Sequence, residues 1–193
     1  AECIGSSLNG KPAGSFGLVG TYSFNGNKTI TCGGGGAIVT DNEELAKFAK
    51  HITTTAKEPH KYKYRHDQVA YNYRMPNLNA AMACAQLEQL EAYVENKREL
   101  AGIYNHFFDD LEVDFIEERV GTKANYWLNA VLFENESKRN GFLDYSNEQG
   151  VMTRPGWDLM NSLDMYKACQ KDDLSISQNI YNRLVNIPSS VRL

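Results

Sequence analysis

Lys28 lies in a stretch whose residue types and spacing favour covalent chemistry at a side-chain amine. Residues 20–24 before it have the composition of a strand that ends, and the four glycines at 33–36 lead into a second strand at 37–40. A lysine held between two buried strands can present its amine to a carbonyl group. Such an amine forms a Schiff base, which is how pyridoxal 5′-phosphate (PLP) is anchored in enzymes. A solvated lysine beside a flexible glycine loop is the alternative.

The elements that must position this lysine are short strands and an amphipathic helix. Thr40 and Glu43 match a capping box, in which the Thr40 side chain accepts a hydrogen bond from the Glu43 amide. Apolar residues at helical spacing follow, so we expect a helix over residues 41–51. Strands are predicted at residues 16–20, 22–24 and 37–40.

A long connection and a long helix come next. Residues 53–75 show little periodicity, and a connection of this length indicates a functional segment or a subunit contact. Pro76 suits the first turn of a helix. The apolar pattern then predicts one continuous helix to about residue 110, where we place the boundary between two domains.

The second half of the chain is predicted to be an α+β unit with an antiparallel sheet. A helix over residues 136–149 is expected to end at Gly150, and a last helix is expected over residues 176–184. Strands are predicted at residues 113–116, 125–133, 151–154 and 184–188.

Composition excludes several classes of protein. The 193 residues carry a net charge of −4, which disfavours nucleic acid and anionic membranes as partners. No apolar run is long enough to span a bilayer, and the four cysteines and four histidines lack metal-ligand spacing. We therefore expect a cytoplasmic protein without a metal. The chain opens with Ala1 in mid-pattern, which predicts a piece of a longer protein.

Basic and aromatic residues alternate over residues 60–66. Such interleaving resembles the stripe of a protein that binds single-stranded nucleic acid, but the acidic chain argues against that partner. A nucleotide sugar offers the same features on a smaller scale. We therefore favour a loop that faces a nucleotide sugar or a second subunit over a solvated run of charges.

Several segments together resemble one enzyme family. Ser23-Phe24 and Lys28 with the glycine turn are similar to the Ser-Phe-x-x-x-Lys signature of the DegT/StrS-type sugar-nucleotide aminotransferases. Residues 71–75 resemble the Asn-x-Arg-Met block of that family, and residues 1–5 look like the end of its Asp-Ala-Ala-x-x-x-Gly segment. Residues 150–155 resemble its small-domain strand near the substrate. One departure is the turn, where many members have Gly-Glu-Gly-Gly.

The resemblance implies an α/β fold of the aspartate-aminotransferase type (PLP fold type I) that works as a homodimer with a shared active site. This chain would be the C-terminal half. Residues 1–110 would form the C-terminal part of the PLP-binding large domain with its linking helix, and residues 111–193 the small α+β domain. The aspartate that pairs with the pyridine nitrogen would lie ahead of Ala1.

The resemblance also implies an activity of the kind used in polysaccharide biosynthesis. It is PLP-dependent transamination of a nucleotide-linked 4-keto-6-deoxy sugar, with L-glutamate as amino donor. Among other details, the sequence at residues 51–57 resembles that of one subgroup of the family. Enzymes of this subgroup aminate C4 of UDP-linked 4-keto-6-deoxy-N-acetylhexosamine in bacillosamine or legionaminic acid pathways.

Site residues follow from the same resemblance. Lys28 would be the catalytic lysine and would carry a proton between the amino donor and the cofactor. Ser23 would donate to the phosphate, Glu2 would lie near the ring oxygen, and Asn72 would reach the phosphate of the neighbouring subunit's cofactor. Tyr71, Arg74 and Arg154 would bind the substrate. Ordinary alternatives exist for these residues, since serine, asparagine and arginine are common at strand ends, turns and surfaces.

Three other interpretations remain open. A sugar dehydratase of the same family would replace the lysine by histidine, and Lys28 argues against it. A truncated, non-catalytic domain would only fold and associate. A sugar-nucleotide-binding module would use the tyrosine-rich segment without PLP.

Overall fold

The computed structural model describes residues 1–192, and the chain separates into two compact units. Unit 1 comprises residues 1–95 and 120–125, and unit 2 comprises residues 96–119 with the chain from residue 126 onward. The division between the two units therefore falls between residues 95 and 96, inside a helix, and not at the expected boundary near residue 110. No helix of the described residues is long and apolar enough to cross a membrane.

Unit 1 holds two small antiparallel sheets. One has the order β2-β1-β6 and the other pairs β3 with β4. Gly36 is required at the start of β4, because a Cβ there would lie 2.3 Å from the Tyr22 carbonyl oxygen across the pair. The predicted strand at 16–20 forms only from residue 20. The strands are β1 (Ser7–Leu8), β2 (Lys11–Pro12), β3 (Gly20–Ser23), β4 (Gly36–Val39) and β6 (Thr122–Lys123).

The predicted helix after β4 is present as α1 (Glu43–Thr53), but its predicted cap is wrong. Asn42 is the N-cap, and its side-chain oxygen accepts from the Leu45 amide at 2.9 Å. Thr40 instead donates to the Leu18 carbonyl at 2.7 Å, which keeps it on the extended segment before the helix. The capping oxygen therefore comes from the residue next to the first helical turn.

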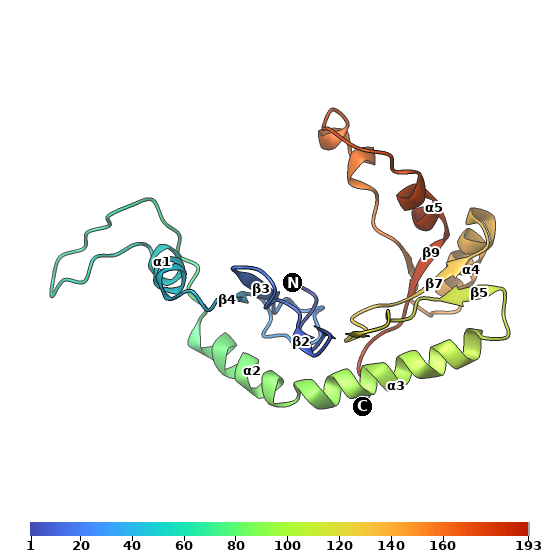
Figure 1. The fold of residues 1–193 in the computed structure, drawn as a ribbon, viewed down its shortest axis with the longest axis horizontal. Helices are drawn as coiled ribbons and strands as arrows, with labels where there is room; N and C mark the ends of the chain where they lie inside the picture. The colour runs from blue at the N-terminus through green and yellow to red at the C-terminus, as the bar shows by residue number, and fades with distance from the viewer. Residues whose placement is uncertain (193) are drawn as a thin grey trace. The chain divides into compact units, whose positions relative to one another are not determined.

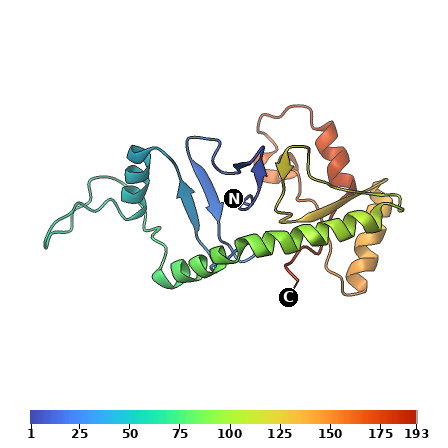
Figure 2. The ribbon, with the colours of Figure 1, turned by 60° about the horizontal axis from the view of Figure 1, so that its bottom comes forward.

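The predicted long helix is two helices, α2 (Asn77–Glu88) and α3 (Leu90–Phe108), which are separated by Gln89. The chain changes direction between them (Figure 2). Gln89 leaves the regular helix and donates its amide to Gln86 in a tighter turn. The break allows Ala83 of α2 and Leu90 of α3 to contact the same apolar cluster. That cluster is the core of unit 1 and comprises Ile4, Phe24, Ile30, Cys32 and Ala83.

Unit 2 is built on a four-stranded antiparallel sheet of order β5-β7-β9-β8, which confirms the predicted α+β unit. Helices α4 and α5 pack on the sheet and on each other (Figure 1). Val131 and Val185 are fully buried between these layers. The elements are β5 (Val113–Phe115), β7 (Asn129–Phe133), α4 (Glu136–Glu148), β8 (Arg154–Pro155), α5 (Ser175–Arg183) and β9 (Leu184–Ile187), with 3₁₀ turns η1 (Met160–Ser162) and η2 (Asp164–Tyr166).

Two predicted strands of unit 2 are shorter than expected. The strand predicted over 125–133 begins at Asn129, because Tyr126 has a φ of 44° that a strand does not accept. The strand predicted over 151–154 is reduced to Arg154–Pro155. The rings of Trp127 and Trp157 stack in the same unit, with centroids 6.1 Å apart.

A buried lysine ties the C-terminal segment to α3. Lys97 is 4% exposed, and its ammonium donates to the carbonyls of Ser189 and Trp127. The Ser189 hydroxyl in turn accepts from the Asn129 amide at 2.7 Å. No carboxylate of the described chain pairs with Lys97. Burial without a counter-charge lowers the pKa of Lys97 to about 8.

From the lowered pKa of Lys97 we predict that unit 2 becomes more stable in alkaline solution. Between pH 8 and 10.5 the unfolded chain keeps a proton that the folded chain has lost, so the free energy of unfolding should rise with pH. We expect a gain of about 1 to 3 kcal/mol across that window. Urea denaturation followed by tryptophan fluorescence measures it, and Lys97→Met should flatten the dependence. If the free energy of unfolding rises equally with pH in the wild type and in Lys97→Met, then Lys97 does not cause the pH dependence.

Candidate functional site

Lys28 lies in the loop that connects β3 to β4, as the sequence predicts. Backbone hydrogen bonds close this loop at its base, with Phe24 N to Gly35 O at 2.9 Å and Cys32 N to Phe24 O at 3.2 Å. Only 10% of the Lys28 side chain is exposed. A nearly buried amine on a closed loop differs from the solvated surface lysine that was the alternative.

The Lys28 amine donates a hydrogen bond to the Glu2 carboxylate. This hydrogen bond from Lys28 holds the pKa of Glu2 below its ordinary range. The pair therefore persists at neutral pH and is lost on the acid side as the pH falls through the pKa of folded Glu2. The contact of Glu2 with a cofactor stays a prediction, and the structure places its carboxylate beside the predicted reactive amine.

Asn125 fastens the segment that carries Glu2, a role that the sequence did not indicate. Its amide nitrogen donates to the carbonyls of Glu2 and Ile4 at 2.7 and 2.8 Å. Its backbone amide donates to the Ser6 hydroxyl at 3.0 Å. Asn125 is 5% exposed, so these bonds form away from competing water. No local pattern could have revealed them, since the partners lie more than a hundred residues away.

Helix α2 holds the glycine turn that follows Lys28. Asn79 donates its amide to the Cys32 carbonyl at 2.6 Å, and the Gln86 side chain accepts from the Thr31 amide at 3.3 Å. Thr31 also donates its hydroxyl to the Phe24 carbonyl at 3.0 Å. The helix thus positions the Lys28 loop through side chains whose role the sequence did not predict.

Ser23 ends β3, and its oxygen accepts from the Asn25 amide at 3.3 Å. Within residues 1–192 the hydroxyl hydrogen of Ser23 has no acceptor, so it is available to donate to a ligand. The proposed donation of Ser23 to a phosphate stays a prediction.

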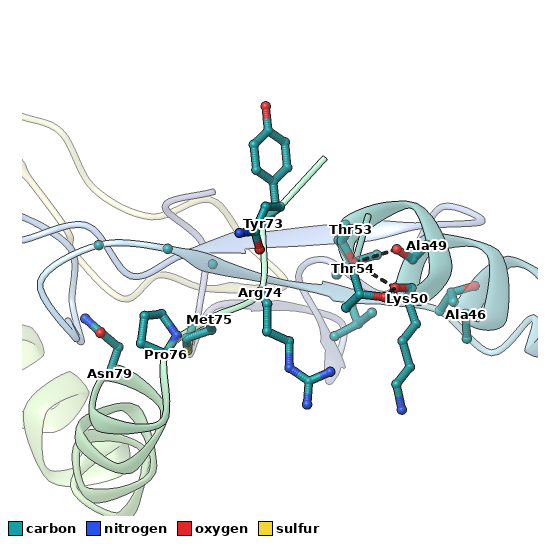
Figure 3. Close-up of a pocket in the computed structure, with 17 residues that line it drawn as sticks. Ala46, Ala49, Lys50, Thr53, Thr54, Tyr73, Arg74, Met75, Pro76 and Asn79 are labelled. Carbon is teal, nitrogen blue, oxygen red and sulfur yellow. Dashed lines mark hydrogen bonds between the residues drawn. The ribbon is translucent and has the colours of Figure 1, made fainter. Parts of the chain in front are cut away.

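A cavity of about 1080 Å³ lies in unit 1 between β4, α1 and the segment before α2 (Figure 3). Two of the predicted site residues, Asn72 and Arg74, line it. Tyr71 does not, and its ring stacks on Tyr73 with centroids 5.0 Å apart. The lining residues are Gly34, Gly35, Gly36, Ile38, Val39, Thr40, Ala46, Ala49, Lys50, Thr53, Thr54, Asn72, Tyr73, Arg74, Met75, Pro76 and Asn79.

Residues 54–72 form an extended two-limbed arm that projects beyond α1 (Figure 1). The limbs are joined near α1 by Thr55 N to Tyr71 O at 2.9 Å and by a bridge between Thr54 and Asn72. Farther out, Lys57 lies 3.9 Å from the centroid of the Tyr64 ring, which is 80% exposed. The arm offers cations and aromatic rings to a partner or a ligand.

The base of the arm is clamped by His51 and Asp67, whose side chains approach to 2.8 Å. The hydrogen bond from His51 holds the pKa of Asp67 below its ordinary value. The clamp therefore contributes above the unfolded pKa of Asp67 and is lost as the pH falls through the folded pKa.

Asp67→Asn should loosen this clamp at neutral pH. We expect faster hydrogen exchange at the amides of Tyr71 and Tyr73, which bond across the base of the arm. Exchange read by mass spectrometry checks it. Asp109→Asn, at the exposed pair of His106 and Asp109 where α3 ends, is the matched control and should leave the arm unchanged. Equal protection of the arm in Asp67→Asn and wild type would refute the clamp.

Arg154 lies in unit 2, on β8, and is exposed. Its guanidinium nitrogen is 3.4 Å from the Met152 sulfur. The structure thus brings Glu2 against Lys28 and places Asn72 and Arg74 on one cavity, whereas the substrate contact of Arg154 stays a prediction. No group of three His, Cys, Asp or Glu residues within 1–192 could hold a metal ion.

The profile of one protein family matches the sequence over residues 1–193. The chain belongs to the DegT/DnrJ/EryC1/StrS aminotransferase family. GDP-perosamine synthase of Vibrio cholerae is 36% identical over 192 residues, which cover 98% of this chain and 52% of that protein. The chain spans about half the length of the curated relatives it matches.

Solved structures of sugar aminotransferases share the fold. The PseC aminotransferase of Helicobacter pylori, involved in pseudaminic acid biosynthesis, superposes with a TM-score of 0.93 at 19% identity. The match covers all of this chain and 53% of that one. The Spr1654 protein of Streptococcus pneumoniae, in its PLP form, gives a TM-score of 0.89 at 18% identity and covers 98% of this chain and 51% of that one.

These comparisons confirm the predicted family and fold class. DegT/DnrJ/EryC1/StrS aminotransferases bind PLP. The closer match to the bacillosamine and legionaminic acid subgroup stays a prediction, because the V. cholerae relative is named for a GDP-linked sugar.

The donor set around Lys28 fits this cofactor. A nearly buried amine suits an aldehyde, the free hydrogen of the Ser23 hydroxyl suits a phosphate oxygen, and the Glu2 carboxylate suits a ring hydroxyl.

Proposed function

We propose that the chain is the lysine-bearing part of a PLP-dependent aminotransferase that acts on nucleotide-linked 4-keto-6-deoxy sugars, with L-glutamate as amino donor. The observation that carries the proposal is the nearly buried Lys28 amine on the closed loop between β3 and β4. The chain's membership of a sugar aminotransferase family supports it.

PLP, when bound, supplies an aldehyde for the lysine amine and a ring that withdraws electrons from the reacting carbon. Lys28 would hold the cofactor covalently through Nζ, and Ser23 would orient it by donating to the phosphate. The Glu2 carboxylate accepts a hydrogen bond from Nζ and would hold the amine in position. The released Nζ would then accept a proton from the α-carbon of the amino donor.

Buried apolar side chains anchor the loop that carries Lys28. Phe24 and Ile30 flank the loop and are 6% and 1% exposed. The Lys28 side chain is only 10% exposed, whereas the Glu2 side chain is 45% exposed and keeps contact with water.

The proposed enzyme is a cytoplasmic homodimer with a shared active site. Asn72 would contact the phosphate of the neighbouring subunit's cofactor, and Tyr71, Arg74 and Arg154 would contact substrate. The exposed cations and rings of the arm support a role in contacting a nucleotide sugar or the second subunit.

The proposal is tested by trapping the cofactor on the 193-residue chain. After incubation with PLP and reduction with borohydride, the peptide that contains Lys28 should carry the mass of one reduced cofactor. Modification spread evenly over exposed lysines, with none preferred, would overturn the assignment of Lys28. That result would favour a domain that folds and associates without catalysis.

A further inference from the structure

One buried side chain of unit 2 lacks hydrogen-bond partners for both of its polar atoms. Asn129 begins β7 and is 1% exposed, and neither its amide oxygen nor its amide nitrogen has a partner within residues 1–192. Its backbone amide, in contrast, donates to the Ser189 hydroxyl at 2.7 Å. A buried amide without hydrogen bonds raises the free energy of the folded state, because the group has given up its bonds to water. Native structures therefore supply such groups with a partner.

The Asn129 side chain lies on the buried face of the sheet. Successive residues of a strand point to opposite faces, and Asn129, Val131 and Phe133 are the buried residues of β7. The antiparallel register pairs Asn129 with Ile187, which is 5% exposed on β9. Because almost none of its surface is accessible, the amide is out of reach of a second copy of the chain and of any bulky ligand. The partner of this amide must therefore be small and enclosed.

Lys97 has one donor to spare in the same unit. An ammonium group carries three hydrogens, and Lys97 uses two of them for the carbonyls of Ser189 and Trp127. The third hydrogen has no acceptor within residues 1–192. Ser189 also accepts from the Asn129 backbone amide, so Lys97 and Asn129 bond to the same buried residue. The spare ammonium hydrogen and the unpaired amide therefore belong to one buried polar cluster.

The unused groups of this cluster indicate the chemical class of the partner. They comprise two donors, the Lys97 ammonium and the Asn129 amide nitrogen, and one acceptor, the Asn129 amide oxygen. An anion only accepts hydrogen bonds, so it would leave the amide oxygen unpaired. A metal cation would bind that oxygen alone and would be repelled by the ammonium group. Water both donates and accepts, and a buried water typically forms about three hydrogen bonds to protein groups that otherwise lack partners.

We propose that unit 2 binds one internal water molecule between Lys97 and Asn129. The water accepts hydrogen bonds from the Lys97 ammonium and the Asn129 amide nitrogen, and it donates to the Asn129 amide oxygen. It thereby joins α3 to β7 beside the existing bonds from Lys97 and Asn129 to Ser189. This inference goes beyond the proposed function and is independent of it, because none of these residues is assigned to the cofactor or the substrate.

Oxygen-17 relaxation dispersion of the solvent tests the proposal, because it counts the water molecules that stay inside the folded chain. Asn129→Leu replaces the amide by an apolar group of similar size and should lower the count by about one. Lys97→Met removes the third partner of the same water and should lower the count by the same amount. The double variant should lose no more than either single variant. A loss of twice that size in the double variant would mean two separate waters and would overturn the proposed bridge.

Thr153→Val is the matched control. Thr153 is a polar residue of unit 2 that is 5% exposed, but its hydroxyl bonds to Ser146 at 2.6 Å and to Asn147 at 3.0 Å. The control should keep the wild-type count, and circular dichroism verifies that each variant folds. An unchanged count in Asn129→Leu, or an equal loss in Thr153→Val, would overturn the proposal.

Crystals of the wild-type chain give a second readout that requires no variant. Density for a water within hydrogen-bonding distance of the Lys97 ammonium and the Asn129 amide supports the proposal. A direct hydrogen bond from Lys97 to the Asn129 amide oxygen, or a dry contact between the two side chains, overturns it. Neither result bears on covalent attachment at Lys28, so this proposal and the proposed function can fail separately.

Discussion

Lys28→Ala is expected to abolish covalent attachment of PLP to the chain and to reduce amine transfer from L-glutamate at least about a thousandfold. The variant removes both the nucleophile and the group that would move the proton, and proton transfer alone contributes about a hundred- to ten-thousandfold. Intact-protein mass spectrometry after borohydride reduction measures attachment. Coupled assay of 2-oxoglutarate formation measures transfer.

Lys11→Ala is the control for this experiment. Lys11 lies in unit 1 on β2, where its ammonium contacts the exposed Phe16 ring at 4.8 Å. Its replacement removes one lysine without disturbing the Lys28 loop, so the adduct should persist. Retention of the adduct and of amine transfer in Lys28→Ala would remove the basis of the proposed function.

Asn125→Ala is expected to have the largest effect on stability. It leaves the part-buried carbonyl of Glu2 and the buried carbonyl of Ile4 without this donor, which should lower the free energy of unfolding by about 2 to 4 kcal/mol. Because the same bonds fix the segment that carries Glu2, the yield of the Lys28 adduct should fall as well. Urea denaturation followed by circular dichroism measures the first effect, and mass spectrometry measures the second.

Asn77→Ala provides the comparison, since Asn77 is exposed on the first turn of α2. We expect a change within about 0.5 kcal/mol. A loss in Asn125→Ala no greater than that in Asn77→Ala would mean that the Asn125 amide is not the anchor described above.

The sequence predicted features that depend on neighbouring residues. The glycine run after Lys28 indicated a loop between strands because glycine allows the tight turn and the close approach of β4 to Tyr22. The antiparallel sheet of unit 2 followed from short strands of alternating character. These signals are local and survive in the folded chain.

Features that depend on distant contacts were missed. Gln89 interrupts the predicted long helix because residues on both sides of it contact one apolar cluster. Asn125 bonds a residue 121 positions away, and no pattern around it indicates this partner. No local pattern indicates that Lys50 lines the same cavity as Arg74.

The two tryptophans of the chain stack on each other, and both belong to unit 2. Intrinsic emission excited at the red edge of the indole band therefore senses only that unit, while unit 1 is optically silent there. A denaturation curve recorded by this emission and one recorded by overall ellipticity will coincide only if the units melt together. The chain thus carries its own probe for independent melting, and no label has to be attached.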